Sequence, residues 1–232
     1  MILKKWDDLP DFMKCEEVLE YYQILQKKKY SLILKRIFDL VCASILLIIL
    51  AIPMLVIAVL IKLDSPGSVF YRQERVTQYG RKFRIHKFRT MVANADQIGT
   101  AVTVGNDSRI TRVGAKIRDY RIDELPQLID VLVGDMSFVG TRPEAVKYVK
   151  KYTREMRATL LLPAGITSEA SIRYKDEADL LDGAKDVDKG YVEQVLPEKM
   201  KWNLESVKNF SVVKDILIMF QTVFAVFGKE YE

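Results

Sequence analysis

Two adjacent carboxylates, Asp123 and Glu124, begin a block of residues that are suited to phosphate chemistry. Pro126 follows closely and fits the first turn of a helix, because the N–H groups there have no intrahelical partner to lose. An aspartate at the N-cap of that helix would accept backbone N–H bonds and face the positive end of the helix dipole. Both effects would keep the Asp123 carboxylate ionised, ready to bind a metal or to attack an electrophile. An ordinary acidic helix cap is the alternative interpretation of these residues.

The motifs around this pair resemble the core of a known enzyme family. In chain order they are Arg-Gln-Glu-Arg-Val at 72–76, Lys-Phe-Arg-Thr-Met at 87–91, Ile-Thr-Arg-Val-Gly at 110–114, Asp-Glu-Leu-Pro-Gln-Leu at 123–128 and Gly-Asp-Met-Ser-Phe-Val-Gly-Thr-Arg-Pro-Glu at 134–144. Together they resemble the bacterial sugar transferases, which are small monotopic phosphoglycosyl transferases that act on polyprenyl phosphate. The resemblance extends from about residue 35 to the C-terminus, and several ordered motifs are more specific than any one of them.

The resemblance implies an enzyme that moves a sugar 1-phosphate from a UDP-sugar to polyprenyl (undecaprenyl) phosphate and releases UMP. Such a reaction initiates the synthesis of bacterial glycoconjugates or exopolysaccharides. By the same resemblance, Asp123 is the nucleophile that carries the sugar phosphate, and Glu124 assists it. Both are expected to contact Mg²⁺, because a metal ion held by carboxylates can neutralise the charge of the donor diphosphate.

Five further residues are expected to bind the donor. The resemblance assigns Arg142 and Pro143 to the nucleotide phosphate or the uridine of the donor. Arg118, Lys87 and Arg89 are additional candidates for binding phosphate. Two other classes of function stay open from the sequence: a membrane scaffold without catalytic activity, and a membrane phosphatase that forms an aspartyl-phosphate.

Composition narrows the class of protein. The chain has 232 residues, which is typical of one domain, and it combines 49% hydrophobic with 29% charged residues. A net charge of +5 suits anionic partners such as phosphates or an anionic bilayer. A nucleic-acid partner is disfavoured because the sequence has no zinc-finger spacing and no aromatic-rich strand motif. Cys15 and Cys42 are too few and too far apart to predict a disulfide framework. The oligomeric state is left open, and it includes a homo-oligomer.

The longest apolar stretch runs from Leu40 to Ile61. Its roughly 22 residues would form a helix about 33 Å long, which is enough to cross the core of a bilayer. A buried core helix is the alternative, and this length disfavours it. Positive residues flank the stretch on both sides, so the positive-inside rule gives no orientation. Asp39, near its start, is expected to pair with Lys35 or Arg36.

Pro53 lies inside this stretch and predicts a break in the helix, because it leaves the carbonyl of Ile49 without its helical partner. A helix–break–helix that enters and leaves by the same face would explain both the proline and the symmetric flanking charge. The resemblance implies this re-entrant topology. It also implies an inner-membrane protein in bacteria whose catalytic domain lies on the cytoplasmic face.

The expected fold is α+β and mainly helical, with a re-entrant membrane helix, short strands and interfacial amphipathic helices. Residues 1–30 form an arm or short helix outside the main domain, 31–63 the membrane-inserted segment, and 64–232 the catalytic domain. Within that domain the patterns predict strands between 69 and 91 with a turn at Tyr79 and Gly80, helices over 110–120 and 147–161, and an interfacial helix over 211–228. Residues 93–107 are expected to form a loop, and the acidic residues of 176–188 a solvated surface.

Overall fold

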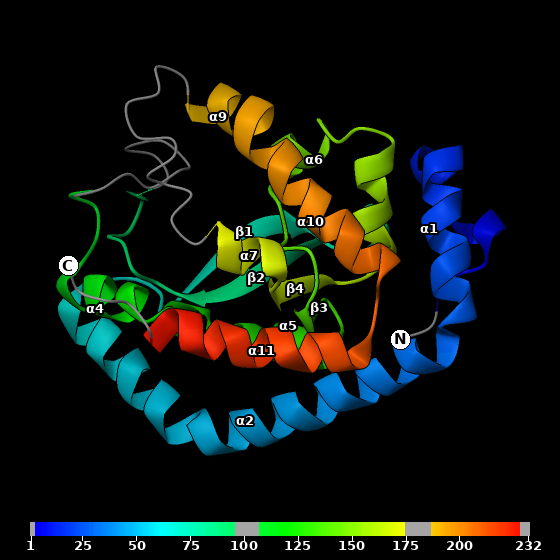
Figure 1. Cartoon of the computed structure of the whole chain (residues 1–232). Helices are drawn as coiled ribbons and strands as arrows, with labels where there is room; N and C mark the ends of the chain where they lie inside the picture. Colours follow the sequence, from blue (N-terminus) through cyan, green and yellow to red (C-terminus); the bar gives the residue numbers. More distant parts are fainter. Residues whose placement is uncertain (1–2, 96–106, 175–186, 228–232) are drawn as a thin grey trace.

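The computed structural model describes residues 3–95, 107–174 and 187–227 (Figure 1). Of the described residues, 64% are helical and the strands are short, which confirms the mainly helical α+β class. Most of the predicted loop 93–107 and of the acidic stretch 176–188 lies outside the described residues. The elements below are therefore those of the described ranges.

The helix α2, Lys29–Asp64, is the longest element in the described ranges, and it contains Pro53. Figure 1 shows α2 as two limbs that meet at a bend along one side of the molecule, as expected for a proline inside a helix. Among the described residues, α2 is the one helix that is long and apolar enough to cross a membrane. Only 6% of its most apolar 18-residue window is buried by the rest of the protein. This low burial speaks against the core-helix alternative.

An antiparallel hairpin follows α2, as the sequence predicts. Strand β1, Phe70–Val76, pairs with β2, Lys82–Phe88, so that Phe70 lies opposite Phe88. The short 3₁₀ turn η3, Gln78–Gly80, joins the two strands. Tyr79 and Gly80 have positive φ values of 59° and 75°, which confirms the predicted turn at this dipeptide.

The second sheet is a parallel pair, β3 (Met136–Val139) and β4 (Ala164–Thr167), that the sequence does not predict. Between the hairpin and β3 lie α4 (Arg112–Asp119), the 3₁₀ turn η4 (Ile122–Glu124) and α5 (Gln127–Val133). The predicted helix over 147–161 is wrong as one element, because the chain there forms α6 (Val146–Val149) and a separate 3₁₀ segment, η5 (Glu155–Leu161). The remaining elements are α7 (Glu169–Arg173), α9 (Val187–Gly190), the π-helical turn η6 (Tyr191–Val195), α10 (Leu196–Lys208) and α11 (Val212–Phe227).

The N-terminal arm is part of the main core, so the prediction that it lies outside the main domain is wrong. It contains two short 3₁₀ turns, η1 (Trp6–Asp8) and η2 (Asp11–Met13), and the helix α1 (Glu16–Lys27). Side chains of this arm are fully buried in the largest hydrophobic cluster, together with residues of η5 and α10. Burial of this many apolar side chains is enough to hold the arm in place.

The helix α11 lies alongside α2, between it and the strands (Figure 1). An ion pair joins the two helices, with Lys35 Nζ 2.5 Å from Asp215 Oδ2. Asp39 pairs with neither Lys35 nor Arg36, contrary to the prediction. Its fully buried carboxylate instead accepts a hydrogen bond from Ser137 Oγ (2.8 Å) on β3. These contacts fix α2 to α11 and to the parallel strands, next to the site described below.

Candidate active site

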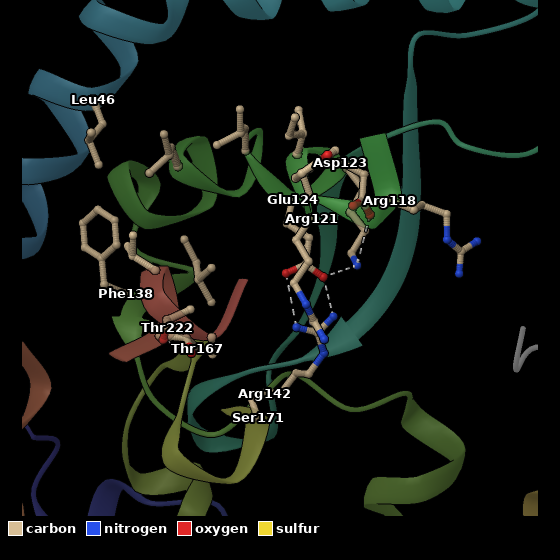
Figure 2. A pocket seen from close by; sticks show the side chains of 18 of the residues that line it. Leu46, Arg118, Arg121, Asp123, Glu124, Phe138, Arg142, Thr167, Ser171 and Thr222 are labelled. Atoms are coloured by element: carbon tan, nitrogen blue, oxygen red, sulfur yellow. Dashed lines mark hydrogen bonds and ion pairs between the residues drawn. The ribbon is translucent and has the colours of Figure 1, made fainter. Parts of the chain in front are cut away.

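A cavity of about 640 Å³ lies between η4, the parallel strands, α2 and α11 (Figure 2). Its lining has two different ends. The charged end carries Asp123, Glu124 and Arg142, with Lys87 beside them. The other end is mostly apolar, and its lining residues include Leu46, Leu50, Leu128, Phe138, Ile166, Ile172, Val223 and Ala225.

The 3₁₀ turn η4 presents the two carboxylates to the cavity. Arg121, just before it, has a left-handed backbone (φ 53°), which redirects the chain at the end of α4. Asp123 lies within this turn, whereas Pro126 occupies the N-cap of α5. The prediction that Asp123 caps the helix is therefore wrong. A separate turn before the helix holds both adjacent side chains at the wall of the cavity.

Glu124 is held between two cations that come from distant parts of the chain. Its Oε1 accepts hydrogen bonds from Lys87 Nζ (2.7 Å) and from Arg142 Nη2 (2.5 Å), and its Oε2 lies 3.3 Å from Arg142 Nη1. Figure 2 marks these contacts. Asp123 is less tightly paired, with its Oδ2 3.9 Å from Lys87 Nζ. The site thus combines one firmly neutralised carboxylate with a more loosely held neighbour.

The environments of the two adjacent acids shift their pKa values in opposite directions. Burial by itself would raise the pKa of Glu124, but the charges and hydrogen bonds of Arg142 and Lys87 outweigh it and hold that pKa well below the usual range. Burial raises the pKa of Asp123, and the negative charge of Glu124 adds to this against the opposing field of Lys87. The expectation that a helix cap lowers the pKa of Asp123 is wrong, because the cap is absent and desolvation dominates.

The other predicted donor-binding residues are placed differently from one another. Arg118 lines the cavity near Asp123, and its side chain extends away from the Glu124 cluster (Figure 2). Pro143 is buried behind Arg142 and is not among the lining residues. Arg89 is also not brought into the site. It is 7% exposed and donates hydrogen bonds to backbone carbonyls just after α2, including that of Ser65 (2.7 Å).

The donor set for Mg²⁺ consists of the two adjacent carboxylates. In the described part of the chain, no group of three or more His, Cys, Asp or Glu side chains is arranged to hold a metal ion by itself. Mg²⁺ commonly binds through one or two carboxylates and takes its other oxygen ligands from substrate phosphates and water. Asp123, which is the more loosely paired of the two, and Glu124 are the carboxylates that would hold an ion of that kind.

Comparison with known proteins identifies the family of the chain. The family model of the bacterial sugar transferases matches residues 30–229, which is most of the chain. The chain belongs to the bacterial sugar transferase family. The resemblance stated from the motifs is thereby confirmed.

Relatives of this bacterial sugar transferase act on different sugars. A UDP-N-acetylgalactosamine–undecaprenyl-phosphate N-acetylgalactosaminephosphotransferase of Aeromonas hydrophila is 39% identical over 82% of the chain. A UDP-glucose:undecaprenyl-phosphate glucose-1-phosphate transferase of Escherichia coli K12 is 36% identical over 83% of the chain. The chain spans only 43% and 40% of these two relatives. The exopolysaccharide production protein PSS of Rhizobium leguminosarum is 38% identical over 83% of the chain, which covers 94% of that protein.

The apolar end is the part of this transferase's site that sequence reasoning missed. Leu46 and Leu50 come from α2, Phe138 from β3 and Val223 from α11. Leu46 and Leu50 are four residues apart, so they lie on one face of α2. Nothing in the continuous apolar run distinguishes that face from the others. The contribution of α11 depends on packing between segments more than 160 residues apart, and no local signal reveals it.

Proposed function

We propose that this protein transfers a sugar 1-phosphate from a UDP-sugar to polyprenyl phosphate, undecaprenyl phosphate in the bacterial membrane, and releases UMP. The observation that carries the proposal is the two-ended cavity. Its charged end suits a diphosphate, and its apolar end begins at the membrane helix α2. A reaction between a water-soluble donor and a lipid acceptor needs both kinds of surface within one site.

The transfer proceeds in two displacements at the phosphorus that bears the sugar. An Asp123 carboxylate oxygen attacks this phosphorus, and the bond to the bridging oxygen breaks so that UMP leaves with the electron pair. A phosphate oxygen of the acceptor then attacks the aspartyl-phosphosugar, and the Asp123 carboxylate departs. The product is a polyprenyl diphosphate sugar. Asp123 must be ionised for the first step, because only the carboxylate can attack phosphorus.

Electrostatic stabilisation comes from the groups around Glu124. Lys87 and Arg142 supply positive charge beside the nucleophile, where charge builds up on the transferred phosphoryl group. Glu124 holds both cations in place within a partly buried site. Mg²⁺, when bound by Asp123, Glu124 and the donor phosphates, would neutralise further charge on the diphosphate. Arg118 lies near enough to bind the donor from the other side of Asp123.

The membrane arrangement follows from the exposed apolar surfaces. In α2 the exposed side chains include Ile48 and Ile52, and in α11 they include Phe220 and Phe224. We infer that α2 enters and leaves the cytoplasmic leaflet of the inner membrane at the Pro53 bend, and that α11 lies in the plane of the interface. The acceptor's isoprenoid chain would then reach the apolar end of the cavity directly from the bilayer.

The test uses the purified protein in lipid nanodiscs and a panel of UDP-sugars, with and without Mg²⁺ and undecaprenyl phosphate. We expect UMP release that stops near one equivalent without acceptor and turns over with it. Asp123→Asn should abolish both. The matched control is Asp135→Asn, which lies in the same block but pairs with Arg81 (2.6 Å) outside the cavity and should keep near-normal turnover.

Three results would overturn the proposal. Release of inorganic phosphate in place of a lipid-linked product would point to a phosphatase. A folded protein that releases UMP from no donor in the panel would point to a scaffold. Normal turnover by Asp123→Asn would exclude Asp123 as the nucleophile.

A further inference from the structure

A buried charged cluster lies close to Arg142 in the chain, the arginine that binds Glu124. Glu144, two residues after Arg142, is 7% exposed, and its Oε1 accepts a hydrogen bond from Tyr191 Oη (2.5 Å). Lys199 Nζ is 3.7 Å from the same oxygen and donates to Tyr191 Oη (3.2 Å). Tyr191 and Lys199 are 5% and 4% exposed. The cluster therefore joins η6 and α10 to the segment that carries Arg142.

A cluster of this kind is a costly way to stabilise a core. Removing a carboxylate and an ammonium group from water carries a desolvation penalty, and well-packed apolar residues often stabilise a fold as well or better. Tyr191 is also the first residue of a π-helical turn, a backbone irregularity that is frequent at functional sites. These two features suggest that the cluster serves the geometry of the neighbouring segment.

The segment from Gly140 to Glu144 is held at both ends. At its beginning, Gly140 N donates to the Thr167 carbonyl (3.0 Å), and Gly165 N donates to the Thr141 carbonyl (2.9 Å). At its end, Val76 N donates to the Glu144 carbonyl (3.0 Å), and the Glu144 side chain reaches the buried cluster. Arg142 lies midway between the two attachments and extends toward Glu124 (Figure 2).

We propose that Glu144, Tyr191 and Lys199 are positioning residues, which hold the 140–144 segment so that the Arg142 guanidinium stands where the donor's diphosphate binds. The inference rests on the proposed function. A guanidinium that binds phosphate through two parallel N–H groups needs a fixed position and a fixed plane. Loosening one attachment of the segment would let Arg142 sample other positions and would weaken donor binding without removing a contact to the donor.

The deciding comparison is between two tyrosine variants. Tyr191→Phe removes only the hydroxyl that donates to Glu144. Tyr21→Phe is the matched control, because Tyr21 is also 5% exposed in the same hydrophobic cluster, and its hydroxyl donates to Glu155 Oε1 (2.7 Å). Both variants should unfold at similarly lowered temperatures. Only Tyr191→Phe should raise the KM for the UDP-sugar, by about tenfold, with the KM for polyprenyl phosphate unchanged.

A double-mutant cycle then separates positioning from general destabilisation. UDP binding is measured by calorimetry for the wild type, Tyr191→Phe, Arg142→Ala and the double variant. If Tyr191 acts through Arg142, its substitution weakens UDP binding about tenfold in the wild type and has almost no effect once Arg142 is absent. Glu144→Gln, which keeps a hydrogen-bond acceptor, should fall between the wild type and Tyr191→Phe.

The possible failures are distinguishable. Equal UDP affinities for Tyr191→Phe and Tyr21→Phe, or additive effects in the cycle, would overturn the positioning role while leaving the transferase intact. A wild-type protein that neither binds UDP nor releases UMP would instead overturn the proposed function.

Discussion

Replacing Glu124 by glutamine tests the electrostatic description of the site. The wild-type carboxylate is 11% exposed and faces Lys87 and Arg142, whose side chains are 22% and 28% exposed. Glutamine keeps the shape and one acceptor oxygen but removes the negative charge, so that two partly buried cations would face a neutral amide. We expect Glu124→Gln to lower the free energy of unfolding at neutral pH.

The magnitude follows from the burial of the partners. Removing one member of a fully buried ion pair costs roughly 3–5 kcal/mol. Both cations here keep some contact with solvent, which screens the loss, so about 2 kcal/mol is the expected decrease. For a chain of this length, about 1 kcal/mol corresponds to a shift of roughly 2–4 °C in the unfolding temperature. Glu124→Gln should therefore lower the Tm by about 4–8 °C.

The lowered pKa of Glu124 also predicts how the Tm difference between the wild type and Glu124→Gln changes with pH. In the folded protein, Arg142 and Lys87 hold the pKa of Glu124 well below the usual range of a glutamate. A depressed pKa contributes stability that is fully present above the unfolded-state pKa and is lost as the pH falls through the folded-state pKa. The Tm difference between the wild type and Glu124→Gln should thus be constant near neutral pH and should shrink in acid below about pH 4.5.

The assay is tryptophan fluorescence during heating, in one detergent and at one scan rate, from neutral pH into acid. Glu74→Gln is the matched control, because Glu74 pairs with Lys82 at 3.1 Å while both side chains are more than half exposed. That exposed pair should contribute less than about 1 kcal/mol. Equal Tm values for the two variants, or a difference that grows toward acid, would refute the reasoning.

Three further substitutions test other parts of the structure. Arg89→Ala should lower the Tm, by loss of its bonds to carbonyls after α2, and leave the KM for UDP-sugar unchanged in steady-state assays; a raised KM would instead support the donor role expected from the sequence. Asp39→Ala should destabilise by about 2–3 kcal/mol in thermal unfolding, since it leaves the buried Ser137 hydroxyl without this acceptor, and an unchanged Tm would contradict that contact. Gly165→Ala would place a Cβ 2.2 Å from Gly140 N, so UDP binding measured by calorimetry should fall at least tenfold, and wild-type affinity would show that this close packing is unimportant.

The sequence predicts those parts of the fold that depend on local pattern. The apolar run of α2, the hairpin with its turn at Tyr79 and Gly80, and the helix α11 all follow from periodicity or turn chemistry within a few residues. The position of the N-terminal arm in the main core cannot be predicted in this way, because the pattern of a short charged helix does not reveal which elements it packs against. Its buried side chains, such as Met13 and Leu25, belong to a hydrophobic cluster that also contains residues of η5 and α10, more than 100 residues away.

Arg89 shows why membership of a motif does not define a residue's position. Lys87 and Arg89 are two apart, and in a continuous strand they would point to the same face. The strand β2 ends at Phe88, so the alternation does not extend to Arg89. Lys87 faces Glu124, whereas Arg89 turns back to the end of α2. The point at which a strand ends depends on its partner strand and is hard to predict within one or two residues.

The charge state of the two adjacent carboxylates also depends on residues that are distant in the sequence. Sequence reasoning identified Asp123 and Glu124 as a pair but predicted stabilisation of the Asp123 charge by a helix cap. In the structure the stabilising charges, Lys87 and Arg142, arrive from 37 and 18 residues away in the chain and act mainly on Glu124. Two neighbouring acids whose environments move their pKa values apart are suited to different roles. Glu124 is suited to hold the cations as a permanent anion. Asp123 is less tightly paired, which is consistent with the nucleophilic role that we propose for it.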